Sequence, residues 1–218
     1  ALATAYALQA LVGLGWSPRV GNIFTGEGLA EQLGVISAQR RLFARLLAMA
    51  AEEGLLSREN NVLGDAAQWK VVGLLEKRAD PATLAAALDG HAEGIQAELA
   101  LVQRCGTALA AALRGETDAL SLLFPNGSLA LVEPLYRDAP AARIYNTLVA
   151  RNVVQAVQLA RQAESTASGT TPLRILEIGA GSGATTSYIL SLLDATASEH
   201  AAVEYWFTDV SPLFLARA

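Results

Sequence analysis

The sequence predicts an α/β protein: a mainly helical N-terminal part with a winged-helix-like element, followed by the start of a Rossmann-like core. The chain is rich in Ala and Leu, which favours helices. Residues 173–193, LRILEIGAGSGATTSYILSLL, then read as strand, glycine-rich turn and helix, and residues 203–209, VEYWFTD, as the next strand. With 52% hydrophobic and 17% charged residues, a chain of 218 residues can bury a substantial core.

The charge balance and the cysteine content narrow the class of protein. A net charge of −5 gives no electrostatic reason to expect a nucleic acid partner, because a surface that follows phosphates needs clustered Lys and Arg. The one cysteine, Cys105, cannot form an internal disulfide, so we expect a cytoplasmic protein. The sequence has neither a signal peptide nor a long apolar run, so we expect no contact with a membrane. The chain starts without Met inside a predicted helix, so we expect it to be part of a longer protein.

Residues 28–72 have the order helix, turn, helix and two-stranded wing, which is typical of a winged helix. Winged helices can bind DNA, and Arg40, Arg41 and Arg45 would lie on the second helix. The predicted wing, however, carries no excess of basic residues. We therefore favour a structural or dimerising role over DNA binding.

A polar segment, STASGTTP at residues 165–172, is the best candidate for an internal boundary. Before it, Pro140 suits the first turn of a long helix that reaches about Gln162. We therefore expect a helical domain over residues 1–166. Residues 167–218 would form the first βαβ part of the Rossmann-like core.

The glycine-rich turn predicts a ligand site. Only glycine lets the backbone turn this sharply and approach a ligand, and the helix that begins near Gly183 offers free N–H groups. The spacing of Glu177, Gly179, Gly181 and Gly183 differs from the dinucleotide pattern, in which two residues separate the second and third glycines. An acid before the first glycine suits a ligand that carries an adenosine and a cation. S-adenosylmethionine is such a ligand.

A second acid, Asp209, stands at the tip of the next predicted strand, where it could accept hydrogen bonds from both ribose hydroxyls. The carboxylates of Glu177 and Asp209 would then flank one crevice. The alternative is that the glycines only form a tight turn and that Asp209 only caps a helix. The candidate cofactor-binding residues in this stretch are Glu177, Gly179, Ala180, Gly181, Ser182, Gly183, Asp209 and Val210.

Other chemistry is not indicated by the residue pattern. The two histidines, His91 and His200, have no partner set that suggests acid–base catalysis or a metal site. No nucleophile triad and no metal-ligand spacing is present in the sequence. We therefore expect no metal and assign no catalytic residue.

Three stretches resemble the C-methyltransferase domains of modular polyketide synthases. They are LEIGAGSGATT, YWFTDVSPLFLARA and, at residues 123–146, LFPNGSLALVEPLYRDAPAARIYN. The segments at 207–211 and 135–138 carry most of the resemblance, because ordinary methyltransferases do not share them. Ala139 departs from the family, which more often has Ser there.

The resemblance implies a class I methyltransferase core that binds S-adenosylmethionine, with the helical part acting as a lid. Tyr145, early on the long helix, would then line the mouth of the cofactor crevice, although packing alone explains it equally well. The acceptor would be the α-carbon of a β-ketoacyl thioester on an acyl carrier protein, and the other partners would be neighbouring synthase domains. In the family a His-Glu pair downstream of the cofactor motif removes the proton. This chain ends at Ala218, before that pair, so we expect no turnover by the chain alone.

Two further functions remain open. A non-catalytic pseudo-methyltransferase would keep the fold for the architecture of a synthase. A free-standing O-methyltransferase of small molecules would share the winged helix and the cofactor loop. Methyl-transfer assays with and without a carrier protein separate these alternatives.

Overall fold

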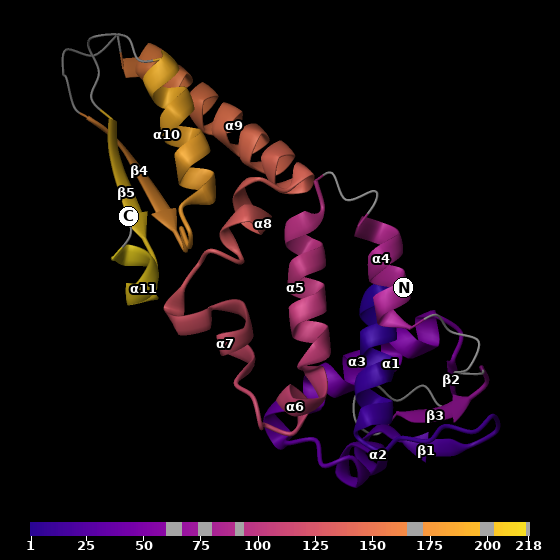
Figure 1. Ribbon diagram of the computed structural model, residues 1–218. Coiled ribbons are helices and arrows are strands. Elements are labelled where there is room, and N and C mark those ends of the chain that lie inside the picture. The colour runs from indigo at the N-terminus through magenta and orange to yellow at the C-terminus, as the bar shows by residue number, and fades with distance from the viewer. Residues whose placement is uncertain (60–66, 74–79, 90–93, 165–171, 197–202, 217–218) are drawn as a thin grey trace. The chain divides into compact units, whose positions relative to one another are not determined.

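The computed structural model describes residues 1–59, 67–73, 80–89, 94–164, 172–196 and 203–216. They form two compact units, Ala1–Asn126 and Gly127–Ala218, which we call the N-terminal unit and the C-terminal unit (Figure 1). Each unit combines helices with a small sheet, and each is described by itself.

The N-terminal unit begins with a winged-helix arrangement, as predicted. Its strands form an antiparallel sheet in the order β1-β3-β2, so β1 adds a third strand to the two expected. The predicted wing residues 60–66 lie outside the described residues. The elements are α1 (Leu2–Gly13), β1 (Ile23–Thr25), α2 (Gly26–Gln32), the 3-10 turn η1 (Ser37–Gln39), α3 (Arg40–Glu52), β2 (Leu56–Arg58) and β3 (Gln68–Val71).

Apolar side chains from all parts of this arrangement meet in one core. Leu11 of α1, Phe43 and Leu47 of α3 and Val71 of β3 are among its most deeply buried members. Helix α3 is amphipathic and turns its apolar face inward, whereas α1 is apolar on most sides and buries six of its twelve residues. The core therefore holds the winged helix together without a disulfide or a metal among the described residues.

Two of the arginines considered for DNA contact have partners within this unit. Arg40 donates hydrogen bonds from Nε to the carbonyl oxygen of Val35, at 3.1 Å, and from Nη1 to that of Glu27, at 3.2 Å. Arg45 forms an exposed ion pair with Glu52, at 2.5 Å. Both guanidinium groups thus contact neighbouring parts of the same unit.

Four further helices complete the N-terminal unit, and α1 packs against the first three of them. The side chain of Asp118 accepts hydrogen bonds from the backbone of Leu120 and Ser121 and so caps the last helix. The helices are α4 (Pro81–Asp89), α5 (Gln96–Thr107), α6 (Leu109–Leu113) and α7 (Ala119–Leu123).

The C-terminal unit has the predicted order of strand, glycine-rich turn, helix and strand. A 3-10 turn η4 (Pro125–Gly127) lies at its start. Strands β4 and β5 are parallel and in register from the pair Leu173 and Val203 to the pair Ile178 and Thr208. The elements are α8 (Glu133–Arg137), α9 (Pro140–Glu164), β4 (Leu173–Ile178), α10 (Ala184–Thr196), β5 (Val203–Thr208) and α11 (Pro212–Leu215).

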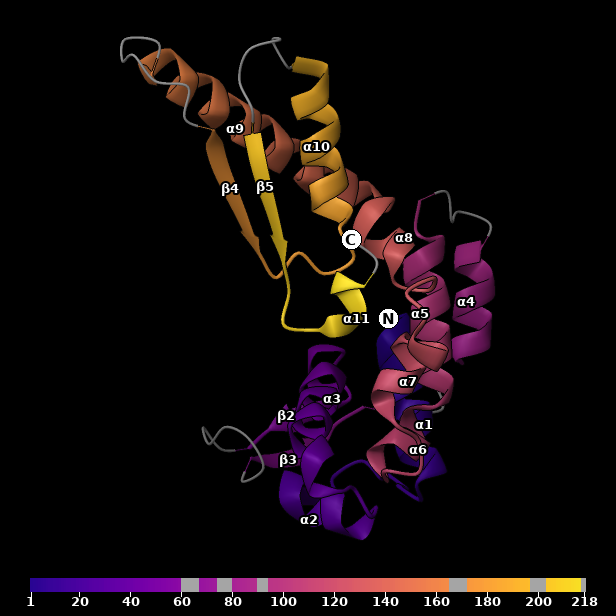
Figure 2. The ribbon, with the colours of Figure 1, turned by 90° about the vertical axis from the view of Figure 1, so that its left-hand side faces the viewer.

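The two-stranded sheet has a covered face and an open face. Every second residue of β4 from Leu173 to Glu177 is half-buried, and the residues between them, from Arg174 to Ile178, are exposed. Figure 2 shows α9 and α10 on one side of the sheet, and α9 packs along α10. Because side chains alternate between the faces of a strand, the half-buried set faces these helices.

The division of the chain differs from the expected one. The polar linker predicted a boundary after residue 166, whereas the compact units divide between Asn126 and Gly127. The reason is the packing of α9, which lies against α10 of the Rossmann-like part. Most of the linker itself, residues 165–171, lies outside the described residues.

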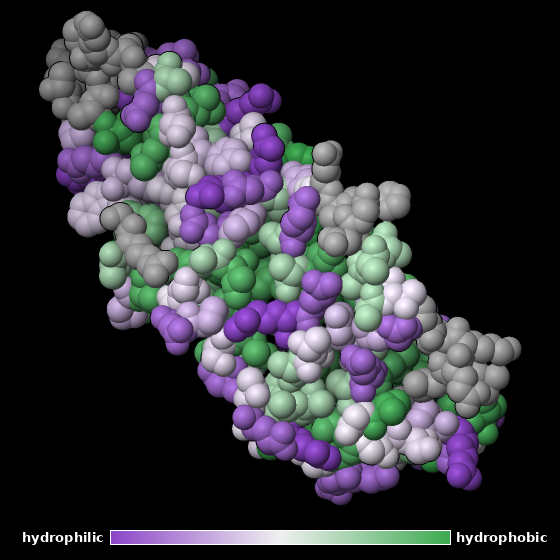
Figure 3. Space-filling view, in the orientation of Figure 1, coloured by the Kyte–Doolittle hydropathy of each residue, from purple (hydrophilic) through white to green (hydrophobic). Residues whose placement is uncertain are grey.

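Apolar side chains also reach the surface. Helix α9 exposes Ile144, Leu148 and Leu159. On the face of the molecule shown in Figure 3, hydrophobic and hydrophilic residues are interspersed. Among the described residues, none of the helices combines the length and the apolar character that a membrane span needs.

The contact between α1 and α5 gives a stability prediction. A Cβ added to Gly106 of α5 would overlap ring carbons of Tyr6 on α1, which is buried. Gly106→Ala should therefore lower the free energy of unfolding by about 1–3 kcal/mol, although alanine favours a helix. Chemical denaturation measures this change. Gly13→Ala is the matched control, because no atom lies within 4 Å of a Cβ at Gly13; equal stability of both variants would contradict the prediction.

Candidate functional site

The glycine-rich turn adopts backbone angles that only glycine adopts readily. Gly179, Gly181 and Gly183 have φ of 75°, 58° and 74°. A Cβ at Gly179 would meet nothing within 4 Å, and one at Gly181 only the carbonyl oxygen of Gly179 at 4.0 Å. The glycines at 179 and 181 are therefore required by the conformation of the turn and not by crowding within the protein. The space beside them is open to a ligand.

The turn is fixed to the end of the neighbouring strand. The N–H groups of Gly179 and Ala180 both donate to the carbonyl oxygen of Thr208, at 2.9 and 3.0 Å. Helix α10 begins directly after Gly183. The turn thus has one wall made by the end of β5 and ends in the N-terminus of a helix of 13 residues, which attracts negative charge.

Asp209 lies beside the turn, as the sequence predicted. Its Oδ2 accepts a hydrogen bond from the N–H of Gly181 at 2.9 Å, and its Oδ1 accepts one from the N–H of Ser211 at 2.8 Å. A carboxylate has about four lone-pair sites, so these two bonds leave about two for a ligand. Asp209 is not the N-cap of a helix, because Ser211 is the N-cap of α11, and its two bonds with backbone N–H groups are compatible with a role as ribose acceptor.

Glu177 has different surroundings from those of Asp209. Its side chain is on the covered face of β4, where Oε2 accepts hydrogen bonds from Thr186 Oγ1 at 2.5 Å and from Tyr205 Oη at 2.9 Å. Burial, the hydrogen bond to Glu177 and the charge of Glu177 raise the pKa of Tyr205. Asp209 thus bonds directly to the turn, whereas Glu177 bonds to α10 and β5.

A cavity of about 370 Å³ adjoins the turn within the C-terminal unit. Its walls come from the turn, the first two turns of α10, β5 and α11. Its lining is mainly apolar and aromatic, with a few hydroxyl groups, which is typical of ligand pockets. The lining residues are Leu129, Gly181, Ser182, Gly183, Thr186, Ser187, Leu190, Tyr205, Phe207 and Phe214.

The remaining candidates do not line this cavity. Tyr145 is 69% exposed on α9, and the side chain of Val210 is fully exposed. Glu177, Gly179, Ala180 and Asp209 are likewise outside its lining. Residues 181–183 of the turn therefore line the cavity, while the N–H of Gly181 bonds to Asp209 outside the cavity lining.

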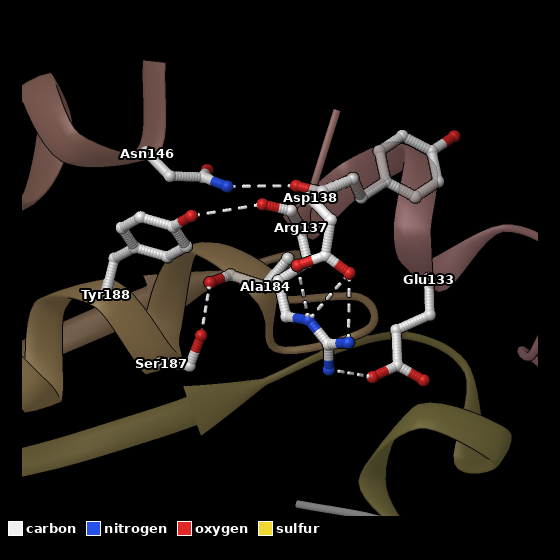
Figure 4. A network of polar contacts seen from close by, with 8 residues as sticks. Glu133, Arg137, Asp138, Asn146, Ala184, Ser187 and Tyr188 are labelled. Carbon is white, nitrogen blue, oxygen red and sulfur yellow. Dashed lines mark hydrogen bonds and ion pairs between the residues drawn. The ribbon is translucent and has the colours of Figure 1, made fainter. Parts of the chain in front are cut away.

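A polar network fixes the start of α10 to α8 and α9 (Figure 4). Asn146 of α9, only 7% exposed, donates from Nδ2 to the carbonyl oxygen of Tyr136 at 2.9 Å and accepts from Thr185 Oγ1 at 2.8 Å. Tyr188 donates from its hydroxyl to the carbonyl oxygen of Arg137 at 3.1 Å. The start of α10, which follows the glycine-rich turn, is thus held by helices α8 and α9, which precede the turn in the chain.

The LYRD segment forms the exposed end of the same network. Arg137 forms ion pairs with Asp138 at 3.0 Å and with Glu133 at 2.5 Å. Its hydrogen bonds and charge hold the pKa of the Asp138 carboxyl below its usual range. In Figure 4 the guanidinium group lies between the two carboxylates.

The sequence interpretation missed the roles of Asn146, Thr186 and Tyr205 in this region. The sequence offered no clear signal for these roles, because the burial of Asn146 and its contact with Thr185 appear only in the packed fold. Among the described residues, no group of His, Cys, Asp and Glu is arranged to hold a metal.

The comparisons with known proteins agree with this geometry. The chain is 36% identical over 196 residues to the polyketide synthase ThaG of Burkholderia thailandensis. The match covers 88% of this chain and 3% of ThaG. It is 40% identical over 116 residues to the non-reducing polyketide synthase tazA of Aspergillus terreus. This match covers 52% of the chain and 4% of tazA. The chain thus spans a few percent of the length of these relatives. No protein-family model matches it.

Solved structures match nearly the whole chain. The CurJ carbon methyltransferase is 34% identical with a TM-score of 0.81, and the match covers 99% of this chain and 52% of that one. The DszA carbon methyltransferase is 28% identical with a TM-score of 0.76 and the same coverage. The CMeT domain of the citrinin polyketide synthase, 23% identical with a TM-score of 0.77, shares the fold.

The Rossmann-like strands, the glycine turn and Asp209 thus belong to a methyltransferase fold. Within this class, the chain is similar to carbon methyltransferases, CurJ and DszA, and to segments of polyketide synthases such as ThaG. It spans about half the length of the solved domains that it matches.

Asn146 gives a stability prediction. Asn146→Ala would leave the carbonyl oxygen of Tyr136 and the hydroxyl of Thr185 without their partner, and buried unpaired groups cost about 1–3 kcal/mol of folding free energy. Urea denaturation should show a loss of this size. Asn152→Ala, at an exposed position of the same helix, is the control and should cost less. Equal losses would show that the Asn146 bridge contributes no more than a surface contact.

Proposed function

We propose that the protein is a cytoplasmic S-adenosylmethionine-dependent C-methyltransferase domain of a polyketide synthase. The observation that supports this most is the arrangement of Gly181 and Asp209, in which a glycine turn after β4 meets an acid after β5. An acid in this place can accept hydrogen bonds from ribose hydroxyls, and glycines beside it allow a nucleoside to approach.

The chain's own residues would bind and orient the cofactor. Asp209 would receive the ribose hydroxyls at the lone pairs that Gly181 and Ser211 leave free. The positive φ of Gly179 and Gly181 keeps side chains away from the ligand. Glu177 would attract the amino group, since its Oε1 accepts no hydrogen bond from a described residue. When bound, S-adenosylmethionine supplies an electrophilic methyl group on a sulfonium.

We infer that the acceptor is the α-carbon of a β-ketoacyl thioester carried by an acyl carrier protein. A bond forms from this carbon to the methyl group, the sulfur–methyl bond breaks, and the α-proton leaves to a base. We assign no residue of this chain as that base. The support for this acceptor is that the curated relatives are polyketide synthases of which this chain matches a few percent, which also suggests neighbouring synthase domains as partners.

The leading function explains more of the observations than either alternative does. A non-catalytic pseudo-methyltransferase would have no need of the glycine conformations and of the acid beside them, but both are present. An O-methyltransferase of small molecules would not explain the similarity to carbon methyltransferases over 99% of the chain.

Cofactor binding is tested by two substitutions in the full-length protein. Gly181→Val places a branched side chain at a positive φ where the ligand approaches, and Asp209→Ala removes hydrogen bonds worth about 1.5–3 kcal/mol to a charged group. Each should weaken S-adenosylhomocysteine binding about tenfold or more in calorimetric titrations. Asp194→Ala, at an exposed position of α10, is the control and should leave the affinity unchanged. Unchanged affinity in both test variants would refute the site.

The acceptor is tested with a carrier protein loaded with a β-ketoacyl group. Incubation with S-adenosylmethionine and the full-length protein should add one methyl group on carbon, which fragmentation mass spectrometry locates. The same reaction with Asp209→Ala protein should be slower, because the cofactor is held less tightly. Methylation of oxygen alone would favour the small-molecule alternative, and cofactor binding without any transfer would favour the pseudo-methyltransferase.

A further inference from the structure

The carboxylate of Glu177 is held by two hydroxyl groups at only one of its oxygens. Thr186, in the first turn of α10, and Tyr205, in the middle of β5, both donate to Oε2. None of the described residues donates a hydrogen bond to Oε1. The side chain thus joins three elements, β4, α10 and β5, directly beneath the glycine turn, and keeps one oxygen available.

Both donors are fixed. The side chain of Thr186 is buried, at 7% exposure, and Tyr205 is half-buried. Since the pKa of Tyr205 is raised, its hydroxyl keeps its proton and donates throughout the ordinary pH range. Two fixed donors on one oxygen restrain the rotation of the carboxylate, which is otherwise a broad torsion.

The position of Glu177 gives this restraint a functional meaning. Glu177 lies two residues before Gly179, and both hydroxyl donors line the cavity that borders Gly181 and Gly183. A ligand cation at the turn would meet an oriented Oε1 and would not have to order the side chain on binding. Preorganisation of this kind increases affinity by lowering the entropic cost of binding.

We propose that Tyr205 and Thr186 are positioning residues that hold Oε2 of Glu177, so that Oε1 receives the α-ammonium group of the cofactor. This inference rests on the proposed function. It assigns a role to two residues whose hydroxyl groups would otherwise serve only to pack β5 and α10.

Three adenosine ligands separate this role from a purely structural one. S-adenosylhomocysteine carries an ammonium and a carboxylate, its decarboxylated analogue carries only the ammonium, and methylthioadenosine carries neither. In calorimetric titrations of the full-length protein, Tyr205→Phe and Thr186→Val should each lower the affinity for the first two ligands about tenfold. This is the loss expected for one charge-assisted hydrogen bond. Methylthioadenosine should bind each variant as it binds the wild type, which also shows that the site is folded.

Two matched controls accompany these variants. Thr186→Ser keeps the hydroxyl and should restore binding of the decarboxylated analogue to the wild-type level. Tyr188→Phe removes a hydroxyl of the same unit that donates to Arg137, and it should leave the ratio of affinities unchanged. A loss shared by all three ligands, or no loss for the ammonium ligands, would overturn the positioning role. If the wild type binds none of the three, the proposed function itself fails, and this inference with it.

Discussion

The hydrogen bond from the N–H of Gly181 to Asp209 is the interaction on which the candidate site depends. It joins the turn after β4 to the first residue after β5, and it forms only because the two strands are parallel and in register up to Ile178 and Thr208. Parallel strands bring their carboxyl ends to the same edge of a sheet, which is where ligands bind in open α/β folds. The positive φ of Gly181 belongs to the turn conformation that presents this N–H to the acid.

Support from below the sheet keeps this edge in place. The carbonyl oxygen of Thr208 accepts two hydrogen bonds from the turn and so holds the turn against the end of β5. The side chain of Glu177 connects β4 to α10 through Thr186 and to β5 through Tyr205. From the other side of α10, the buried amide of Asn146 reaches Thr185. Apart from Oε1 of Glu177, these polar atoms have hydrogen-bond partners, so their burial costs little while it restricts the geometry. The turn is therefore held by its covalent neighbours and by two separate polar clusters.

The sequence predicted β4, the turn and β5 well because their signals are local. A mainly apolar run that ends at Gly179 marks residues 173–178, and Asp209 directly follows the next strand. The partners of Asn146 and Glu177 lie up to 39 and 28 residues away, so only the packed fold reveals them. The division into compact units differs from the predicted domain boundary for the same reason. A polar linker is a local signal, whereas the packing of α9 on α10 decides which unit the helix joins.

Asp209 shows why local interpretation leaves such a residue ambiguous. The sequence allowed it to be either a helix N-cap or a ligand acceptor. The structure gives Ser211 as the N-cap of α11, and each carboxylate oxygen of Asp209 accepts one hydrogen bond from a backbone N–H group. Those bonds fix the carboxylate before any ligand arrives, so a ribose with two hydroxyls would meet two oriented acceptors. Since ordering a free side chain costs about 0.5–1.5 kcal/mol on binding, the two backbone hydrogen bonds would themselves contribute to the affinity of the site. Fixing the turn and recognising a ribose are then two consequences of one geometry.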